Sequence, residues 1–132
     1  LLTDFFDTVF QQFNVSPGQA LLLGFSQGGG MTYRCGLGRA EYFAGLVALS
    51  ATLPDEEELT PLLPQERDQL IFIGHGSFDQ MVSDDTAQSA KSFLESNGYS
   101  PDFHIYNMAH EISEEELSDL VPWIAKALPP KE

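Results

Sequence analysis

The stretch that most constrains the fold is residues 19–31, where an apolar run passes directly into a glycine-rich segment, QALLLGFSQGGGM. This pattern predicts a strand, a sharp turn at Ser26 and a helix. Gly24 and Gly28 stand two residues before and two residues after the serine. A side chain at either position is expected to collide with the neighbouring strand or helix. Such a turn pushes the serine hydroxyl clear of the sheet edge, beside the first free N–H groups of the helix.

The G-x-S-x-G pattern by itself is a moderate signal, because a chain with this glycine and serine content contains it by chance roughly 0.07 times. The flanking sequence strengthens it. Leu21, Leu22 and Leu23 form the short apolar run that a parallel strand buried on both faces requires, and residues 27–37 can be helical. A glycine-rich turn of any α/β protein remains the alternative until partners for Ser26 are found.

Length and charge narrow the class of protein. With 132 residues and 42% hydrophobic content, the chain is expected to form one domain, residues 1–132. It carries 6 basic and 20 acidic residues, a net charge of -14, which opposes binding to nucleic acid and to anionic membrane surfaces. The acidic clusters at residues 55–58 and 111–116 are expected to be solvated faces.

The single cysteine, Cys35, excludes a disulfide within this sequence and is expected to be a small buried apolar residue, which favours a reducing cytoplasm. No apolar run reaches the length of a membrane span. The sequence begins at Leu1 rather than at a methionine, so it is expected to have been processed or cut from a longer protein.

The chain reads as helices and strands in alternation. Helices are expected over residues 1–13, 27–37, 83–97 and 113–128. Strands are expected over residues 21–23, 43–50, 70–74 and 102–106. Because crossover connections are right-handed and short, the strands should run parallel, so the sequence predicts an α/β domain with a mostly parallel sheet of about four strands.

Helix ends carry their own signals. Ser83 is expected to be an N-cap, and Gly98 marks the C-terminal stop of the same helix. Ser113 and Glu116 have the spacing of a capping box, and Pro122 is expected to kink the last helix.

Nucleophilic catalysis by a serine needs a base, and the chain has three histidines. His75 ends the third strand and His104 lies inside the fourth, so both are expected to be structural. His110 follows the fourth strand in a loop, at the carboxyl end of the sheet where Ser26 also emerges. His110 is therefore the candidate base.

The same reasoning selects an acid. Asp79 lies in the loop after the third strand and so also at the carboxyl edge. Asp84, Asp85 and Asp102 stand at the start of a helix or strand, where capping and solvation explain them. Three loops at one edge then supply Ser26, Asp79 and His110, in the chain order nucleophile, acid, histidine that is found in α/β-hydrolases.

Four segments now support a named resemblance: GFSQGG, the strand LVALS, HGSFDQMV, and MAHEIS before the last helix. In register over nearly the whole chain, they resemble the phospholipase/carboxylesterase family of α/β-hydrolases, which includes acyl-protein thioesterases. The resemblance implies a serine esterase without a cofactor, with Ser26 as nucleophile, Asp79 as acid and His110 as base. It implies small-molecule ester substrates with short or medium acyl groups, or lysophospholipids or acyl thioesters, and the backbone N–H of Gln27 as one oxyanion donor.

The sequence also departs from that family, whose members carry a first half that would precede Leu1, including a loop that donates the second oxyanion N–H. The expected fold is thus a partial α/β-hydrolase lacking the N-terminal strands. Losing one oxyanion donor costs about 10²- to 10³-fold in turnover, so activity is expected to be reduced. The strand at residues 21–23 would have one open edge, which predicts a homo-oligomer or a second chain that covers it.

Two other functions remain open from the residues alone. The chain could be a weakly active or non-catalytic fragment that acts as an association module. A metal hydrolase using His75, Asp79 and His110 is the third possibility, although their spacing resembles no common ligand pattern.

The proline-interrupted segment 51–68 is expected to border the substrate site. Seven apolar residues are candidates for an acyl pocket, with packing in the core as an equal alternative for each. They are Phe25, Leu53, Leu62, Leu63, Phe78, Met81 and Met108.

Overall fold

A computed structural model describes residues 2–128, with the side chains of residues 2 and 3 excepted. Within it, four strands form one sheet in the order β1-β2-β3-β4, and every neighbouring pair is parallel. The strands are β1 (Ala20–Phe25), β2 (Phe43–Leu49), β3 (Leu70–Gly76) and β4 (Asp102–Tyr106). The prediction of a parallel α/β sheet of about four strands is confirmed.

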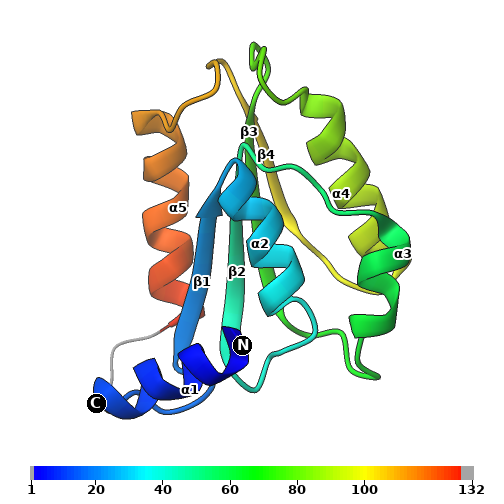
Figure 1. Cartoon of the computed structure of the whole chain (residues 1–132). Coiled ribbons are helices and arrows are strands. Elements are labelled where there is room, and N and C mark those ends of the chain that lie inside the picture. Colours follow the sequence, from blue (N-terminus) through cyan, green and yellow to red (C-terminus); the bar gives the residue numbers. More distant parts are fainter. Residues whose placement is uncertain (1, 129–132) are drawn as a thin grey trace.

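Helices cover both faces of this sheet (Figure 1). One face carries α2 (Gln27–Gly36) and α4 (Asp84–Ser96), with the short α3 (Glu56–Leu59) and the 3-10 turn η1 (Thr60–Leu62) beside them. The other face carries α5 (Glu114–Ala127), and α1 (Leu2–Gln12) lies near the beginning of β1. Leu1, the first residue of the predicted N-terminal helix, lies outside the described residues. None of the described helices is long and apolar enough to cross a membrane.

The strand register aligns the carboxyl ends of the sheet. Gly24 of β1 pairs with Ala48 of β2, Ala48 with Ile73 of β3, and Ile73 with Phe103 of β4. The loops that follow β1, β3 and β4 therefore emerge at one edge, at the top of Figure 1. This edge is where the sequence places its candidate residues.

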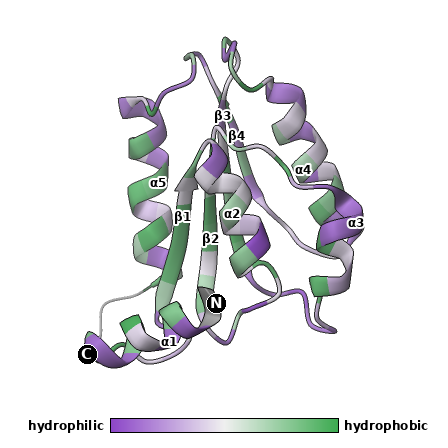
Figure 2. Cartoon of the chain, in the orientation of Figure 1, coloured by the Kyte–Doolittle hydropathy of each residue, from purple (hydrophilic) through white to green (hydrophobic). Residues whose placement is uncertain are grey.

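The core has one layer on each side of the sheet, because residues along the central strands alternate between the two faces. The larger layer includes Tyr33, Leu46 and Leu94, all at most 1% exposed, between the sheet and the helices α2 and α4. The smaller layer joins Phe72 of β3 to Leu120 of α5. Figure 2 shows the corresponding hydrophobic colouring along β1 and β2.

The predicted N-caps at Ser83 and Ser113 are confirmed, but the reciprocal half of the predicted capping box is not formed, because the Glu116 carboxylate has no hydrogen-bond partner among the described residues. The Ser83 hydroxyl accepts a hydrogen bond from the N–H of Asp85, and the Ser113 hydroxyl accepts one from the N–H of Glu116. Gly98 has φ +91°, the left-handed conformation that glycine tolerates at a helix stop. Pro122 lies inside α5, and the kink expected there stays a prediction.

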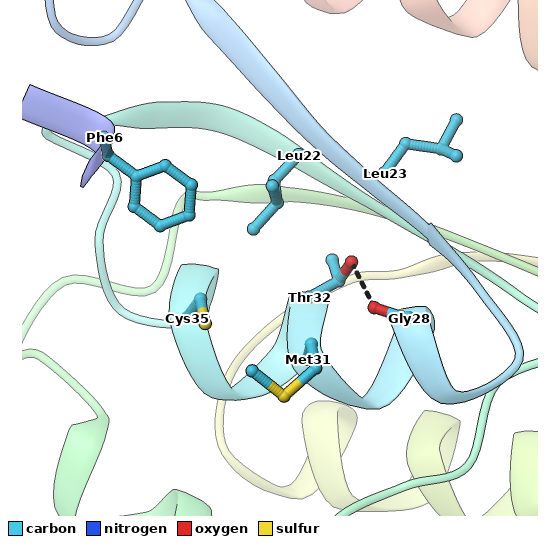
Figure 3. A pocket seen from close by; sticks show the side chains of 7 residues that line it. All are labelled: Phe6, Leu22, Leu23, Gly28, Met31, Thr32 and Cys35. Carbon is cyan, nitrogen blue, oxygen red and sulfur yellow. Dashed lines mark hydrogen bonds between the residues drawn. The ribbon is translucent and has the colours of Figure 1, made fainter. Parts of the chain in front are cut away.

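The sequence-based expectation for β1 is wrong in one respect. The strand was predicted to be buried on both faces, but the Leu23 side chain is 49% exposed. The reason is the strand order: β1 pairs only with β2 and forms an edge of the described sheet. Nearby, Phe6, Leu22 and Met31 line an open apolar pocket of about 340 Å³ between α1, β1 and α2 (Figure 3).

Self-association through this edge stays a prediction. An edge strand presents unpaired backbone groups beside apolar side chains, so we expect a second copy of the chain to pair with β1. Light scattering at micromolar concentration should give a mass above the 14.6 kDa of one chain. Leu23→Lys should restore the monomer, whereas Leu70→Lys, at an equally exposed leucine at the start of β3, should not. A monomeric parent protein would contradict the prediction.

The segment 51–68 only partly meets its expectation. Ala51 and Thr52 contact the first turn of α2, at Gly29 and Gly30, and so lie near the carboxyl edge. Farther along, Leu59 is fully buried in the larger core layer. Ala51, Pro54 and Leu59 are thus the buried residues of the segment, whereas most of its other residues are exposed to solvent.

Glu116 corrects the expectation that residues 111–116 form a solvated face. Its side chain is 0% exposed, and neither carboxylate oxygen has a hydrogen-bond partner among the described residues. A Cβ atom at Gly74 would collide with this carboxylate, so the glycine provides its space. Burial raises the pKa of Glu116 from its ordinary 4.5 to about 7.

This burial predicts a pH-dependent stability. The pKa of Glu116 is higher in the folded than in the unfolded protein. The free energy of unfolding is therefore highest below about pH 4.5, where the carboxyl is neutral in both states, and it falls as pH rises through about 7. The loss amounts to about 3 kcal/mol in the free energy of unfolding. Glu116→Gln should abolish this loss in urea titrations at pH 5 and pH 8. Glu115→Gln, at an exposed position of the same turn, should retain it. If all three proteins show the same pH dependence, the carboxyl is not buried as described.

Candidate active site

The turn between β1 and α2 holds Ser26 in an unusual conformation, with φ 59° and ψ -120°. Its N–H donates to the carbonyl of Leu49 at 2.8 Å, which fixes the turn to the end of β2. A non-glycine residue in this region of conformational space costs about 1–3 kcal/mol, and such strain is typical of functional turns. A Cβ atom at Gly24 would collide with the carbonyl of Gly28 and the hydroxyl of Thr32. The predicted steric need for glycine is confirmed at Gly24.

The same expectation is wrong for Gly28. A Cβ atom built there would have no heavy atom within 4 Å among the described residues. The reason is that Gly28 borders the open pocket beside β1, as the close-up in Figure 3 shows. Within this structure a side chain at position 28 would extend into open space.

His110 lies in the loop between β4 and α5 and contacts two of the predicted residues. Its Nε2 is 3.1 Å from the Ser26 Oγ, and its Nδ1 is 2.6 Å from the Asp79 Oδ2. The ring packs against Phe25, with 4.8 Å between the ring centroids. Side chains 84 and 31 positions apart in the sequence thus meet in series at the carboxyl edge of the sheet.

Asp79 is held by its own loop. Its Oδ1 accepts hydrogen bonds from the N–H groups of Met81 and Val82, at 2.9 and 2.8 Å. Burial alone would raise the pKa of Asp79, but the bonds from Val82, His110 and Met81 and the charge of His110 outweigh it and lower the pKa. The carboxylate form is therefore favoured.

These contacts dictate the tautomer of His110. A carboxylate only accepts hydrogen bonds, so the 2.6 Å contact requires a proton on Nδ1. In the neutral ring, Nε2 then has a free lone pair that faces the Ser26 hydroxyl. This arrangement can remove a proton from a serine hydroxyl, which is the chemical requirement for a serine nucleophile.

Donors for a developing negative charge lie next to the serine. Gln27 is the first residue of α2, and the N–H at this position has no partner within the helix. The Ser26 side chain does not cap these groups. The N-terminal end of α2 therefore presents N–H groups and the positive end of the helix dipole beside Ser26.

The other two histidines are placed differently from each other. His104 lies 3.0 Å from Asp102 and 3.7 Å from Asp119, and its ring stacks on Phe72. These contacts agree with its expected structural role. His75 is 1% exposed and, unexpectedly, its Nε2 lies 3.4 Å from the carboxylate of Asp79. The sequence places His75 four residues before Asp79, which is the one feature that hints at this contact. The spacing does not predict it, because the path of the loop after the strand is not known from the sequence.

The seven candidates for an apolar pocket separate into groups. Phe78 and Met81 line a surface pocket of about 470 Å³ together with His110 and Ala109, and Phe25 packs on the His110 ring. Three others belong to packed regions or are buried, namely Leu53, Leu63 and Met108. Leu62 is 39% exposed and lies in η1, away from the residues that line this pocket.

Two further observations concern other chemistries. Among residues 2–128, no group of three or more His, Cys, Asp or Glu side chains is arranged to hold a metal ion. Cys35 is half-buried, and burial raises the pKa of its thiol although Arg39 and Arg34 act in the opposite direction. A raised thiol pKa does not favour a nucleophilic cysteine.

Comparison with known proteins adds a consistent set of likenesses. Residues 2–128 match the family described as Phospholipase/Carboxylesterase. A protein named Probable carboxylesterase, from Oryza sativa subsp. japonica, is 33% identical over 116 residues, which are 86% of this chain and 44% of that protein. Acyl-protein thioesterase 1 of Mycosarcoma maydis is 32% identical over 120 residues, which are 86% of this chain and 50% of that protein.

The structural likeness agrees. The crystal structure of SOBER1 from Arabidopsis thaliana is 28% identical, with a TM-score of 0.82 over 96% of this chain and 62% of that one. The four-stranded sheet and its helices thus correspond to part of an α/β-hydrolase fold, as expected. The chain spans about half the length of the curated relatives it matches.

Proposed function

This chain belongs to the phospholipase/carboxylesterase family, and from that premise we infer that it hydrolyses carboxylic esters through Ser26, His110 and Asp79. The observation that carries the proposal is the continuous series of contacts from the Ser26 hydroxyl through His110 to Asp79, at 3.1 and 2.6 Å. Its order along the chain and its place at the carboxyl edge of a parallel sheet are those of a serine hydrolase.

The proposed reaction begins when the Ser26 Oγ attacks the acyl carbon and His110 Nε2 takes the hydroxyl proton. Asp79 holds the Nδ1 proton and stabilises the imidazolium that forms. The tetrahedral intermediate then collapses to an acyl-enzyme, and His110 gives its proton to the leaving alcohol. Water enters and attacks the acyl carbon while His110 takes its proton. The second tetrahedral intermediate then collapses as His110 returns that proton to the Ser26 Oγ, which releases the acid and restores Ser26.

Among the described residues we can name one hydrogen-bond donor for the oxyanion of the tetrahedral intermediate. We propose the N–H of Gln27, because it lies at the first position of α2 beside the nucleophile. The geometry of a preorganised donor matters most in the transition state, where charge accumulates on the former carbonyl oxygen. A complete pair of donors would raise turnover by about 10²- to 10³-fold over a single one.

The proposed substrates are small esters with short or medium acyl groups. Exposed apolar side chains beside His110, namely Phe78 and Met81, support an apolar substrate portion on that side. The relatives named carboxylesterase and acyl-protein thioesterase add oxygen esters and acyl thioesters to the range to be assayed, and the phospholipase in the family description adds lysophospholipids. The net charge of -14 makes nucleic acid an unfavourable partner, and the lone cysteine leaves a reducing cytoplasm as the proposed location.

A second candidate function is an association module with weak or no hydrolysis. The open edge of β1 and the apolar pocket beside Leu22 and Met31 favour it, because such a surface invites pairing. One molecule can have both functions. A module without hydrolysis, however, would have no activated serine, so Ser26 would not react with a covalent probe.

Labelling with a fluorophosphonate probe tests the proposed function. The probe reacts only with an activated nucleophile, so mass spectrometry should locate one modification on Ser26 even if turnover is slow. The exposed Ser77, in the loop after β3, should remain unmodified and serves as an internal control. A folded protein that takes up no probe at Ser26 would favour the association module instead.

A further inference from the structure

His75 is a buried histidine that the proposed reaction does not use. It lies near the end of β3, 1% exposed, and its Nε2 makes two contacts. The backbone carbonyl of Val82 lies 2.7 Å away, and the Oδ2 of Asp79 lies 3.4 Å away. The latter is the same oxygen that receives the Nδ1 proton of His110.

The Val82 contact fixes a proton on the His75 ring. A carbonyl oxygen only accepts hydrogen bonds, so a 2.7 Å contact requires that Nε2 carries hydrogen. This N–H donates to the Val82 carbonyl, and its positive end also faces the Asp79 Oδ2 from 3.4 Å. The Asp79 carboxylate therefore lies between the N–H groups of two imidazoles, one buried and one in the catalytic loop.

The same bond closes the loop that carries the acid. Residues 77–82 leave β3 and return to it, because His75 donates to the carbonyl of Val82 while the N–H of Val82 donates to the Asp79 Oδ1. Both polar backbone groups of Val82 are thus engaged, one by His75 and one by Asp79. The position of the carboxylate depends on Val82, and that of Val82 depends on His75.

We propose that His75 is a positioning residue that orients the carboxylate of Asp79 toward His110, through the Val82 carbonyl and through its own N–H beside Oδ2. This inference rests on the proposed function, since it assigns a role within the same site. Groups that hydrogen-bond to the ligands of metal sites contribute about 10- to 100-fold to activity, and we expect an effect of that order for a group that orients a catalytic carboxylate. His75 would act on the rate of the chemical step and leave substrate binding unchanged.

Two amide substitutions separate the bonding role of His75 from its role in packing. The amide nitrogen of glutamine is as many bonds from the backbone as Nε2, whereas that of asparagine corresponds to Nδ1. His75→Gln can therefore donate to Val82, while His75→Asn cannot reach it. We expect His75→Asn to lower kcat about 10- to 100-fold with KM unchanged, and His75→Gln to stay within about threefold of the parent protein.

The pH profile adds a readout that packing alone would not move. Without His75 the Asp79 carboxylate is no longer held toward His110, so it stabilises the imidazolium of His110 less. The acidic limb of kcat/KM, which reports protonation of the catalytic base, should therefore move to lower pH in His75→Asn. It should not move in His75→Gln.

A double-mutant cycle shows whether His75 acts through Asp79. In an Asp79→Asn background the carboxylate is gone, so His75→Asn should cost less than about threefold in kcat. Equal losses in both backgrounds, or a folded His75→Asn protein with the parent kcat and pH profile, would overturn the inference. If His75→Asn does not fold, a folded His75→Gln protein with a tenfold or greater loss overturns it, and one with the parent rate supports it. Failure of the proposed function is distinct, because the parent itself would then take up no fluorophosphonate at Ser26.

Discussion

Ser26→Ala is expected to lower ester hydrolysis by about 10⁴- to 10⁶-fold in kcat, which amounts to the background rate in an ordinary assay. Alanine removes the attacking oxygen. It should leave the fold intact, because it keeps the Cβ atom of serine and the Ser26 hydroxyl makes no capping bond to α2. Hydrolysis of a p-nitrophenyl short-chain ester, followed by absorbance, measures the difference directly.

The matched control for this substitution is Ser77→Ala. Ser77 is an exposed serine at the same edge of the sheet, and only its backbone N–H, which donates to Tyr106, has a described partner. Its hydrolysis rate should equal that of the parent protein. Residual hydrolysis that is the same in the parent and in Ser26→Ala would show that another group, or a contaminant, performs the reaction.

Asp79→Asn is expected to lower kcat by about 10⁴-fold, although it changes a single atom. The loop around residue 79 determines this outcome. The N–H groups of Met81 and Val82 both point at the Oδ1 position, so the amide oxygen must occupy it. The amide NH₂ group then takes the Oδ2 position and faces His110 Nδ1, which has to give up its proton. The proton moves to Nε2, where it points at Ser26 and blocks proton removal.

The comparison variant for Asp79→Asn is Asp85→Asn. Asp85 is an exposed carboxylate in the first turn of α4, where its removal changes net charge by the same amount. Hydrolysis at pH 8 should be unchanged by this substitution. A folded Asp79→Asn protein within tenfold of the parent rate would refute the assigned tautomer of His110.

Much of the fold followed from local patterns. Helical spacing, the Ser83 and Ser113 caps and the left-handed Gly98 each depend on residues within one turn, and the structure agrees with them. The approach of Ser26, Asp79 and His110 was predictable for a more general reason. Carboxyl ends of parallel strands meet at one edge, so three loops after three strands cannot be far apart. The catalytic roles of these residues stay predictions until the variants are measured.

The remaining features depend on contacts that no local pattern fixes. Glu116 shares the spacing of Leu120 on the buried stripe of α5, but a carboxylate in an acidic run indicates solvent until the packing against Gly74 is known. The exposure of Leu23 follows from the neighbours of β1, which an apolar run does not specify. Likewise, the contact of His75 with Asp79 requires the path of the loop that follows β3.

Different backbone hydrogen bonds hold the three residues of the site in place. The loop that bears His110 is bonded to the loop that bears Asp79, because the N–H of Phe78 donates to the carbonyl of Met108 at 3.0 Å. The loops that carry the base and the acid are therefore bonded directly to each other, in addition to the contact between the two side chains. Ser26 is instead tied to Leu49 at the end of β2, so the contact between its hydroxyl and His110 depends on how the end of β2 lies relative to the loop after β4. Heating that loosens the sheet would separate this pair while the imidazole and carboxylate stay together, and turnover would fade before the chain unfolds.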